Sequence, residues 1–248
     1  YSPYTALTSE QVKVCDEILD RLIVSLAHKT KFNAIIEGVA GTGKTVVLIK
    51  VLSELVRLSM ISSGSSSSVA ASSSASSSVY DDDDQESIIS DIERREKDYA
   101  RAAKIRSACP KGLKVAYVVP LSELMPPFRK VIKSVCGNPS IVKSASEVAN
   151  DPDRFDVIFV DEAHRLGTIN KFGANKDPYK QACKNALGIT YVPKMPNPPT
   201  ELDWIVAKTD NCVFVYDENQ KVRCHQSISH VVFDNLVKSK PFSLIYPL

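Results

Sequence analysis

No stretch of about 18 consecutive apolar residues occurs in this sequence of 248 residues, so we expect no membrane-spanning helix. A signal peptide is also missing. The six cysteines include no C-x-x-C pair, and Cys224-His225 lacks a second pair of ligands at zinc-finger spacing. These absences argue against a membrane protein, a disulfide scaffold and a zinc finger, and favour an intracellular protein with reduced thiols. The chain begins at Tyr1 rather than methionine, which is compatible with a fragment of a longer protein.

Basic residues are absent from residues 62–92, a segment that holds the acidic residues Asp81, Asp82, Asp83, Asp84, Glu86 and Asp91. The whole chain has a net charge of +2, so removing these six negative charges leaves +8 on the remainder. A moderately basic body is compatible with a phosphate-rich partner, although many proteins with this charge bind no nucleic acid.

The segment Ser62–Ser78 is almost entirely serine and alanine, and it cannot bury enough apolar surface to offset the entropy of ordering. We therefore expect a disordered Ser-rich and acidic insertion over about residues 62–90. It is either a tolerated loop without a specific role or a regulatory segment, because Ser78 and Ser90 each precede an acidic residue by three positions. The sequence Ser-Asp-Ile-Glu from Ser90 also matches a helix capping box, and we predict that it opens a polar helix to about Ser107.

Outside this insertion, strand-like and helix-like segments alternate along the chain. Apolar runs predict strands at Ala34–Glu37, Leu113–Val119, Asp156–Val160, Asn211–Tyr216 and Phe242–Tyr246. Helical spacing predicts helices at Gln11–Ala27, Gly43–Met60 and Leu121–Val135, the last with an irregularity at Pro126-Pro127. This alternation is typical of an α/β fold with a mostly parallel sheet and helices on both faces. Ligands of such sheets bind beyond the carboxyl ends of the strands.

The first predicted strand leads into an uninterrupted G-x-x-x-x-G-K-T motif at residues 38–45. Between a strand and a helix, this pattern predicts a P-loop that binds a nucleoside triphosphate. The backbone of the loop surrounds phosphate, and its expected contacts are Gly38, Ala40, Gly41, Thr42 and Gly43. Lys44 is expected to reach the β- and γ-phosphates, and the Thr45 hydroxyl to bind Mg²⁺.

Acidic residues follow the strand Asp156–Val160 directly, at Asp161 and Glu162. Paired with a P-loop, Asp161 is expected to hold the Mg²⁺ shell, and Glu162 to act as general base on the attacking water. After the strand Asn211–Tyr216, Gln220 could sense the γ-phosphate or that water, because an amide both donates and accepts hydrogen bonds. Near the N-terminus, Thr8 or Ser9 could cap the first helix, and Gln11 could present its amide to adenine.

These four motifs together resemble the Q-motif and motifs I, II and III of the superfamily 1 helicases. The resemblance is closest to the Schlafen-like ATPases, long filed as a domain of unknown function, and it is carried by Gly38–Val47, Val160–Leu166, Leu202–Ile205 and Phe214–Gln220. It covers about Leu7 to Leu248 apart from the insertion, and it implies a RecA-like ATPase core that uses ATP and Mg²⁺. It also implies contacts with single-stranded DNA or RNA near Pro120-Leu121-Ser122 and Lys143–Ser146.

Two other families share short stretches of this sequence. Residues 161–164 spell the Asp-Glu-Ala-His box of superfamily 2 helicases, but no Ser-Ala-Thr follows them. Asn175-Lys176-Asp177 resembles the guanine-reading Asn-Lys-x-Asp of small GTPases, yet its Asp comes one residue early, and no Asp-x-x-Gly switch stands at the expected place. We interpret this stretch as a surface turn and favour adenine over guanine.

Superfamily 1 enzymes close the nucleotide between two RecA-like domains, and the second domain supplies arginines. Its motifs have no counterpart in this sequence, so we expect residues 1–248 to form a single domain that binds ATP weakly and hydrolyses it slowly alone. An alternative hypothesis is a nucleotide-gated binding or signalling module without unwinding activity. A degenerate scaffold is a third, which the intact Lys44, Thr45, Asp161 and Glu162 disfavour.

Overall fold

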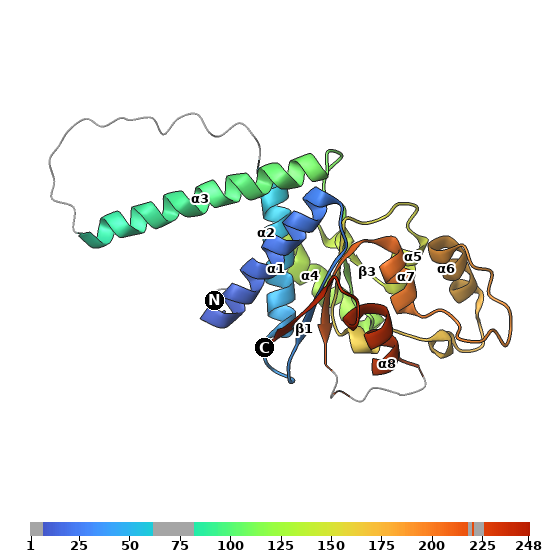
Figure 1. Ribbon diagram of the computed structural model, residues 1–248. Helices are drawn as coiled ribbons and strands as arrows, with labels where there is room; N and C mark the ends of the chain where they lie inside the picture. The colour runs from blue at the N-terminus through green and yellow to red at the C-terminus, as the bar shows by residue number, and fades with distance from the viewer. Residues whose placement is uncertain (1–6, 62–81, 218–219, 221–225) are drawn as a thin grey trace.

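A single parallel sheet forms the centre of the computed structural model, which describes residues 7–61, 82–217, 220 and 226–248. Within these residues its strands are β1 (Phe32–Glu37), β2 (Val115–Val118), β3 (Val142–Lys143), β4 (Val157–Val160), β5 (Asn211–Tyr216) and β6 (Ser243–Pro247). They lie in the order β3-β2-β4-β5-β1-β6, and each neighbouring pair runs parallel (Figure 1). The expected α/β fold with a mostly parallel sheet is confirmed, and it is consistent with a RecA-like core.

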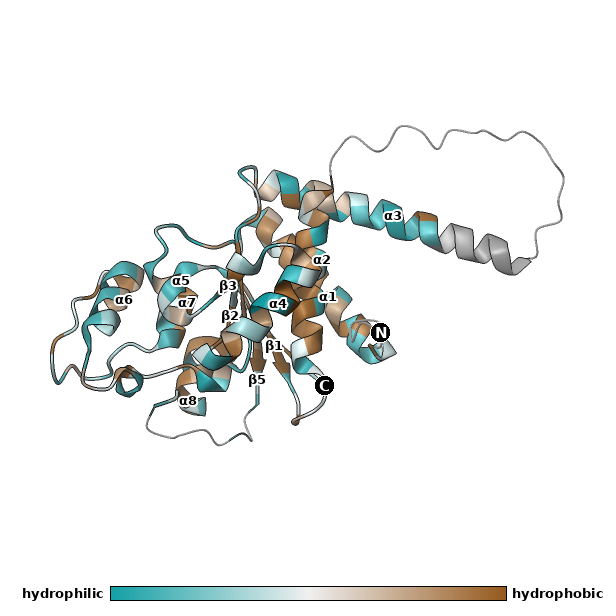
Figure 2. Ribbon diagram, turned by 180° about the vertical axis from the view of Figure 1, so that it is seen from behind, coloured by the Kyte–Doolittle hydropathy of each residue, from teal (hydrophilic) through white to brown (hydrophobic). Residues whose placement is uncertain are grey.

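Two apolar cores cover the two faces of the sheet. Because strand residues alternate between faces, Ala34 and Ile36 of β1 belong to one buried cluster, whereas Ile35 belongs to the other. The same alternation separates Val213 from Phe214 in β5. Strands buried on both faces have to be mostly apolar, which explains their largely apolar sequences and the brown colour of most of β1 and β5 in Figure 2.

Helices cover both faces of the sheet, as predicted (Figure 1). One face is packed against α1 (Ser9–His28), α2 (Lys44–Met60), the end of α3 (Asp82–Ala108) and α4 (Met125–Cys136). The other is packed against α5 (Ala145–Asn150), α6 (Asp177–Leu187), α7 (Glu201–Lys208) and α8 (His230–Phe233). Among these, α2 contributes most directly to the site, because it starts at the P-loop and buries Val47, Leu48, Val51 and Leu52. Burial of each such side chain contributes about 1.5–3 kcal/mol and fixes the helix start against the sheet.

The helix predicted to open at Ser90 begins instead at Asp82, so the capping-box interpretation is wrong, and so is the predicted disorder of residues 82–90. The segment from Asp82 to Ala108 contains neither glycine nor proline, so nothing in the chain stops the helix from extending toward the N-terminus. Figure 1 shows α3 extending away from the rest of the molecule, and Figure 2 shows that it is mostly hydrophilic. Ser62–Ser78 lies outside the described residues.

Local signals explain where the other helices begin. Thr8 caps α1, as expected of Thr8 or Ser9. Its hydroxyl accepts a hydrogen bond from the backbone N–H of Gln11 at 3.2 Å. The helix predicted at Leu121–Val135 opens as a 3₁₀ turn and becomes α4 at Met125. Its prolines follow at once, in the first turn, where a missing N–H costs nothing. The predicted turn at residues 175–177 leads into α6.

Further observations concern the cysteines, the possible metal ligands and the helices in the part of the chain that the structure describes. Cys15, Cys109, Cys136, Cys183 and Cys212 are free thiols, and Cys224 lies outside that part. Among the described residues, no group of three or more His, Cys, Asp or Glu side chains could hold a metal ion. None of the described helices combines the length and the hydropathy that crossing a bilayer requires.

Candidate functional site

Three of the predicted motifs meet at one edge of the sheet because of the strand order. The P-loop follows β1, Asp217 follows β5, and Asp161 follows β4. Strand β5 lies between β1 and β4 and pairs with both. Since all three strands are parallel, their carboxyl ends lie together, and Asp217 is set between the P-loop and Asp161.

Glycine is required at Gly43, where the P-loop turns into α2. This residue is the N-cap of the helix and has a φ of 82°, in the left-handed region that favours glycine. A Cβ at this position would also lie 2.8 Å from the Gln11 amide nitrogen, so the loop and α1 approach closely here. The N-terminus of α2 therefore points its free N–H groups and its positive dipole end toward the loop, an arrangement that attracts phosphate.

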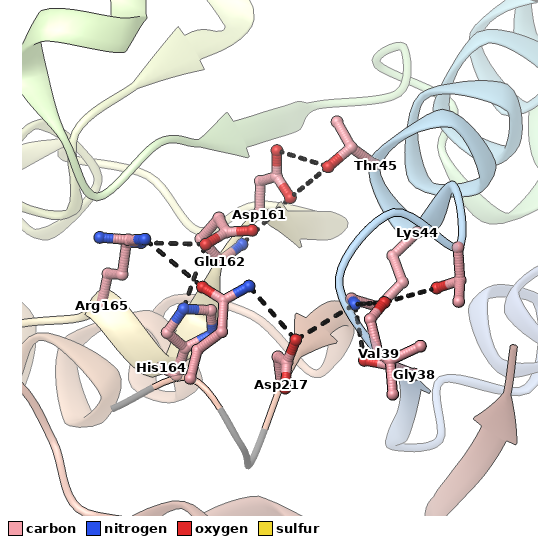
Figure 3. Close-up of polar contacts among 11 residues, drawn as sticks. Gly38, Val39, Lys44, Thr45, Asp161, Glu162, His164, Arg165 and Asp217 are labelled. Atoms are coloured by element: carbon pink, nitrogen blue, oxygen red, sulfur yellow. Dashed lines mark hydrogen bonds and ion pairs between the residues drawn. The ribbon is translucent and has the colours of Figure 1, made fainter. Parts of the chain in front are cut away.

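Lys44 folds back over the P-loop, and only 6% of the residue is exposed. Its ammonium donates hydrogen bonds to the carbonyl oxygens of Gly38 at 2.6 Å and Val39 at 2.8 Å. It also lies 3.5 Å from Oδ2 of Asp217, a carboxylate that is equally buried (Figure 3). The positive charge of Lys44 is thus satisfied within the chain by a carboxylate and two carbonyls.

Asp161 lies in a second group, the Asp161 cluster, which consists of Thr45, Tyr117 and Asp161. The Thr45 hydroxyl donates to Asp161 Oδ1 at 3.0 Å, and the Tyr117 hydroxyl donates to Oδ2 at 3.1 Å. Only 3% of Asp161 is exposed, and this burial raises the pKa of its carboxyl group from 3.8 to about 6, although both hydroxyls oppose the shift. Among the described residues no cation pairs with Asp161, so its charge has hydroxyl donors but no opposite charge.

The Asp161 cluster has the composition of a magnesium site. Mg²⁺ prefers oxygen ligands and keeps several waters, so one hydroxyl and one carboxylate side by side are suitable protein ligands. The hydroxyl of Thr45 and the carboxylate of Asp161 supply such oxygens within 3.2 Å of each other. A cation would also lower the raised pKa of Asp161, because the negative charge would gain a partner. The residues therefore fit the predicted ion.

Glu162 is turned away from Asp161 by an unusual backbone conformation, with φ of 47° and ψ of 48°. A non-glycine residue pays roughly 1 kcal/mol for this left-handed geometry. The turn brings two basic side chains onto its carboxylate: Oε2 lies 3.1 Å from His164 Nε2 and 2.9 Å from Arg165 Nε. The hydrogen bond with His164, followed by that with Arg165, lowers the pKa of Glu162 to about 2 against the opposing effect of burial.

Gln220 connects the two ends of the site. Its amide nitrogen donates to Asp217 Oδ2 at 3.2 Å, and its amide oxygen accepts from Arg165 Nη2 at 3.4 Å. A continuous set of polar contacts therefore runs from Lys44 through Asp217, Gln220 and Arg165 to Glu162, and we call it the Lys44–Glu162 chain (Figure 3). Every predicted catalytic side chain belongs to this set.

Gln11 contacts the P-loop through its side-chain amide nitrogen. This nitrogen donates to the carbonyl oxygen of Thr42 at 2.9 Å, whereas the amide oxygen accepts from the backbone N–H of Thr8, the N-cap of α1, at 3.0 Å. The structure therefore brings Gln11 next to the loop from a distant part of the sequence. Its contact with adenine stays a prediction.

The two segments expected to contact nucleic acid have structural partners of their own. The carbonyl of Pro120 accepts a hydrogen bond from Lys171 Nζ at 3.1 Å, and the same ammonium pairs with the buried Glu201 at 2.8 Å. Ser144 caps α5 in a reciprocal capping box with Glu147. Both segments follow strands at the same sheet edge as the P-loop, and their role in binding stays a prediction.

The sequence predicted no role for four residues of the site: Tyr117, His164, Arg165 and Asp217. Tyr117 lies inside a buried strand, where its side chain gave no signal beyond an apolar pattern. His164, Arg165 and Asp217 lie within the predicted motifs, but the roles in those motifs were assigned to Asp161, Glu162 and Gln220. Asp217 is the first polar residue after an apolar strand, and that position alone could have marked it.

The comparison with known protein families agrees with this arrangement. No curated protein matches the chain. A family model described as Schlafen group 3, DNA/RNA helicase domain, matches residues 31–245, which include the P-loop, the acidic pair and Gln220. The chain therefore belongs to the Schlafen group 3 DNA/RNA helicase domain family.

Proposed function

We propose that this chain binds Mg-ATP and hydrolyses it, as the first motor domain of a superfamily 1 helicase-like ATPase. The observation that carries the proposal is the meeting of a P-loop lysine, Lys44, and Thr45 with Asp161 and Glu162 at the carboxyl ends of the parallel strands β1 and β4, which flank β5. Each of these side chains has the chemistry that its part of phosphoryl transfer requires, and membership of a helicase-domain family supports the same function.

Phosphate binding uses the loop and the lysine. The backbone of Gly38 and of residues 40–43, together with the N-terminus of α2, surrounds the phosphates with N–H groups. Lys44 leaves its carbonyl partners and contacts the β- and γ-phosphates. Thr45 and Asp161 would hold Mg²⁺, which would supply positive charge to the phosphate oxygens. Gln11 contacts the base from the adjacent end of α1.

Hydrolysis uses the carboxylate of Glu162 and the amide of Gln220. Glu162 accepts the proton of the water that attacks the γ-phosphorus in line with the leaving ADP. Its carboxylate lies 3.1 Å from His164 Nε2 and accepts a hydrogen bond from Arg165, so these two side chains have to yield it to the water. Gln220 senses the γ-phosphate, because its amide contacts both Asp217, the partner of Lys44, and Arg165, the partner of Glu162.

Nucleic acid and a second domain complete the proposal. Single-stranded DNA or RNA is the partner that the family description and the moderately basic body support. A second RecA-like domain of the full-length protein supplies arginines to the transferring phosphoryl group, and such residues raise rates by about 10³–10⁵. The single chain is therefore expected to be a weak ATPase.

The test is steady-state ATP hydrolysis by this chain and by the full-length protein, each with and without single-stranded DNA or RNA. We expect slow turnover by the chain, faster turnover by the full-length protein, and stimulation by nucleic acid. Robust turnover by the chain that Lys44→Ala leaves unchanged would refute the assignment. Full-length ATPase activity that does not respond to nucleic acid would favour a nucleotide-gated signalling module over a motor.

A further inference from the structure

The ammonium of Lys44 is bound by three acceptors of the chain itself. Its partners are the carbonyls of Gly38 and Val39 and the carboxylate of Asp217. Lys44 and Asp217 are 6% and 4% exposed, so little water screens the attraction between their charges. A phosphate that binds in the P-loop has to take the ammonium away from these acceptors.

Asp217 is held in place independently of Lys44. Its position at the end of β5, between β1 and β4, is fixed by the pairing of the central strands. Gln220 donates a hydrogen bond to the same Oδ2 atom at 3.2 Å, and Arg165 in turn donates to Gln220. The carboxylate therefore keeps a hydrogen-bond donor when Lys44 leaves. The ion pair can break without leaving the buried carboxylate of Asp217 unsatisfied.

The carbonyls of Gly38 and Val39, like Asp217, compete with phosphate for the Lys44 ammonium. They belong to the P-loop itself, so the lysine lies across the loop whose amides are to face phosphate. Only the carboxylate adds a full negative charge to the acceptors that hold the ammonium. Asp217 therefore opposes nucleotide binding through its attraction for Lys44.

We propose that Asp217 is a positioning residue that competes with nucleotide phosphates for the Lys44 ammonium and recaptures it as the product leaves. It lowers the affinity of the site for ADP. The inference rests on the proposed nucleotide-binding function and adds a product-release device to it.

The experiment measures the dissociation constant of Mg-ADP by isothermal titration calorimetry. Asp217→Asn removes the charge but keeps an oxygen that can accept from Gln220, and we expect it to bind Mg-ADP about tenfold more tightly than the unaltered chain. Its KM for ATP should fall by a similar factor without a rise in kcat. Asp210→Asn is the matched control, because Asp210 lies at the opposite, exposed end of β5, and it should leave the affinity unchanged.

A double-mutant cycle separates competition from simple repulsion. In a Lys44→Met background, Asp217→Asn should change the affinity for Mg-ADP less than twofold. A tenfold gain that persists without the lysine overturns the proposal, and so does an unchanged or weaker affinity of the single variant. Asp217→Ser serves as a second test, and thermal unfolding checks that each variant is folded. If the unaltered chain binds no Mg-ADP, the proposed function itself fails, an outcome distinct from both.

Discussion

The Asp161 cluster and the Lys44–Glu162 chain hold buried charge in opposite ways. Asp161 has two hydroxyl donors and, among the described residues, no cation, and burial raises its pKa to about 6. In the Lys44–Glu162 chain, each carboxylate has a basic partner within 3.5 Å. Within the described residues, the carboxylate of Asp161 thus has no opposite charge beside it, whereas the charges of the Lys44–Glu162 chain neutralise one another. We expect a magnesium nucleotide to bring the missing positive charge to Asp161 and to break the contact between Lys44 and Asp217.

Replacing Lys44 should have the largest effect on ATP hydrolysis, because it removes the positive charge at one end of the Lys44–Glu162 chain. For Lys44→Ala we expect kcat/KM for ATP to fall on the order of 10⁴-fold, as both a charged contact to bound phosphate and a clamp on the transition state disappear. The measurement is ATPase activity of the full-length protein. Lys50→Ala, further along the same helix, is the control and should keep normal activity.

Glu162→Gln tests the other end of the Lys44–Glu162 chain. The amide cannot accept the proton from water, so kcat should fall on the order of 10³-fold while ATP still binds. Single-turnover hydrolysis and a separate ATP-binding titration distinguish the two effects. Glu96→Gln on the exposed part of α3 is the control, and equal activity of Glu162→Gln and the unaltered protein would remove Glu162 from its proposed role.

In the absence of Mg²⁺, replacing Asp161 and replacing Glu162 should change the free energy of unfolding in opposite directions. The folded-state pKa of Asp161 is raised from 3.8 to about 6, so its carboxylate lowers stability progressively as pH rises between these values. At pH 7, Asp161→Asn should stabilise the protein by about 3 kcal/mol at most, since two pKa units are worth about that much.

The pKa of Glu162 is instead lowered from 4.5 to about 2, so its carboxylate contributes stability above pH 4.5 that is lost toward pH 2. Allowing for solvent screening, we expect Glu162→Gln to destabilise the protein by about 1–2 kcal/mol at pH 7. Chemical denaturation in EDTA between pH 4 and 8 measures both variants. Shifts of the same sign would contradict the comparison.

The smallest effect is expected at Gln220, which joins the two charged ends but carries no charge. Gln220→Ala should lower kcat about tenfold and leave ATP binding nearly unchanged, because one neutral contact is worth about 1 kcal/mol. Steady-state kinetics of the full-length protein measure it, and Gln226→Ala is a matched control in the same loop. A larger loss in KM than in kcat would assign Gln220 to ground-state binding.

The strands and the chemistry at their ends could be predicted because a strand buried on both faces has to be apolar along its whole length. The run Asn-Cys-Val-Phe-Val-Tyr at residues 211–216 is an example, and its bounds agree with β5. The strand order could not be predicted, since no local pattern encodes it. The position of Asp217 between Lys44 and Asp161 depends on that order, so the ion pair between Lys44 and Asp217 could not be predicted.

Short helices were missed for a different reason. Helix α5 spans Ala145–Asn150 and α7 spans Glu201–Lys208, too few turns to show a helical period. Both carry capping boxes, at Ser144 and Thr200, that could have indicated them. The same kind of signal misled at Ser90, because a capping box predicts a helix start only where the preceding chain cannot continue the helix.

The course of α2 and α3 has a practical consequence for experiments on this protein. Helix α2 begins at the P-loop and ends at Met60, roughly 25 Å away for a helix of this length. Arg106, near the end of α3, bonds the carbonyl of Ile61, so the base of α3 lies at that distant end (Figure 1). A fluorophore attached at the Met60 end of α2 would sit roughly 25 Å from the P-loop, where it can report on the molecule without altering its chemistry.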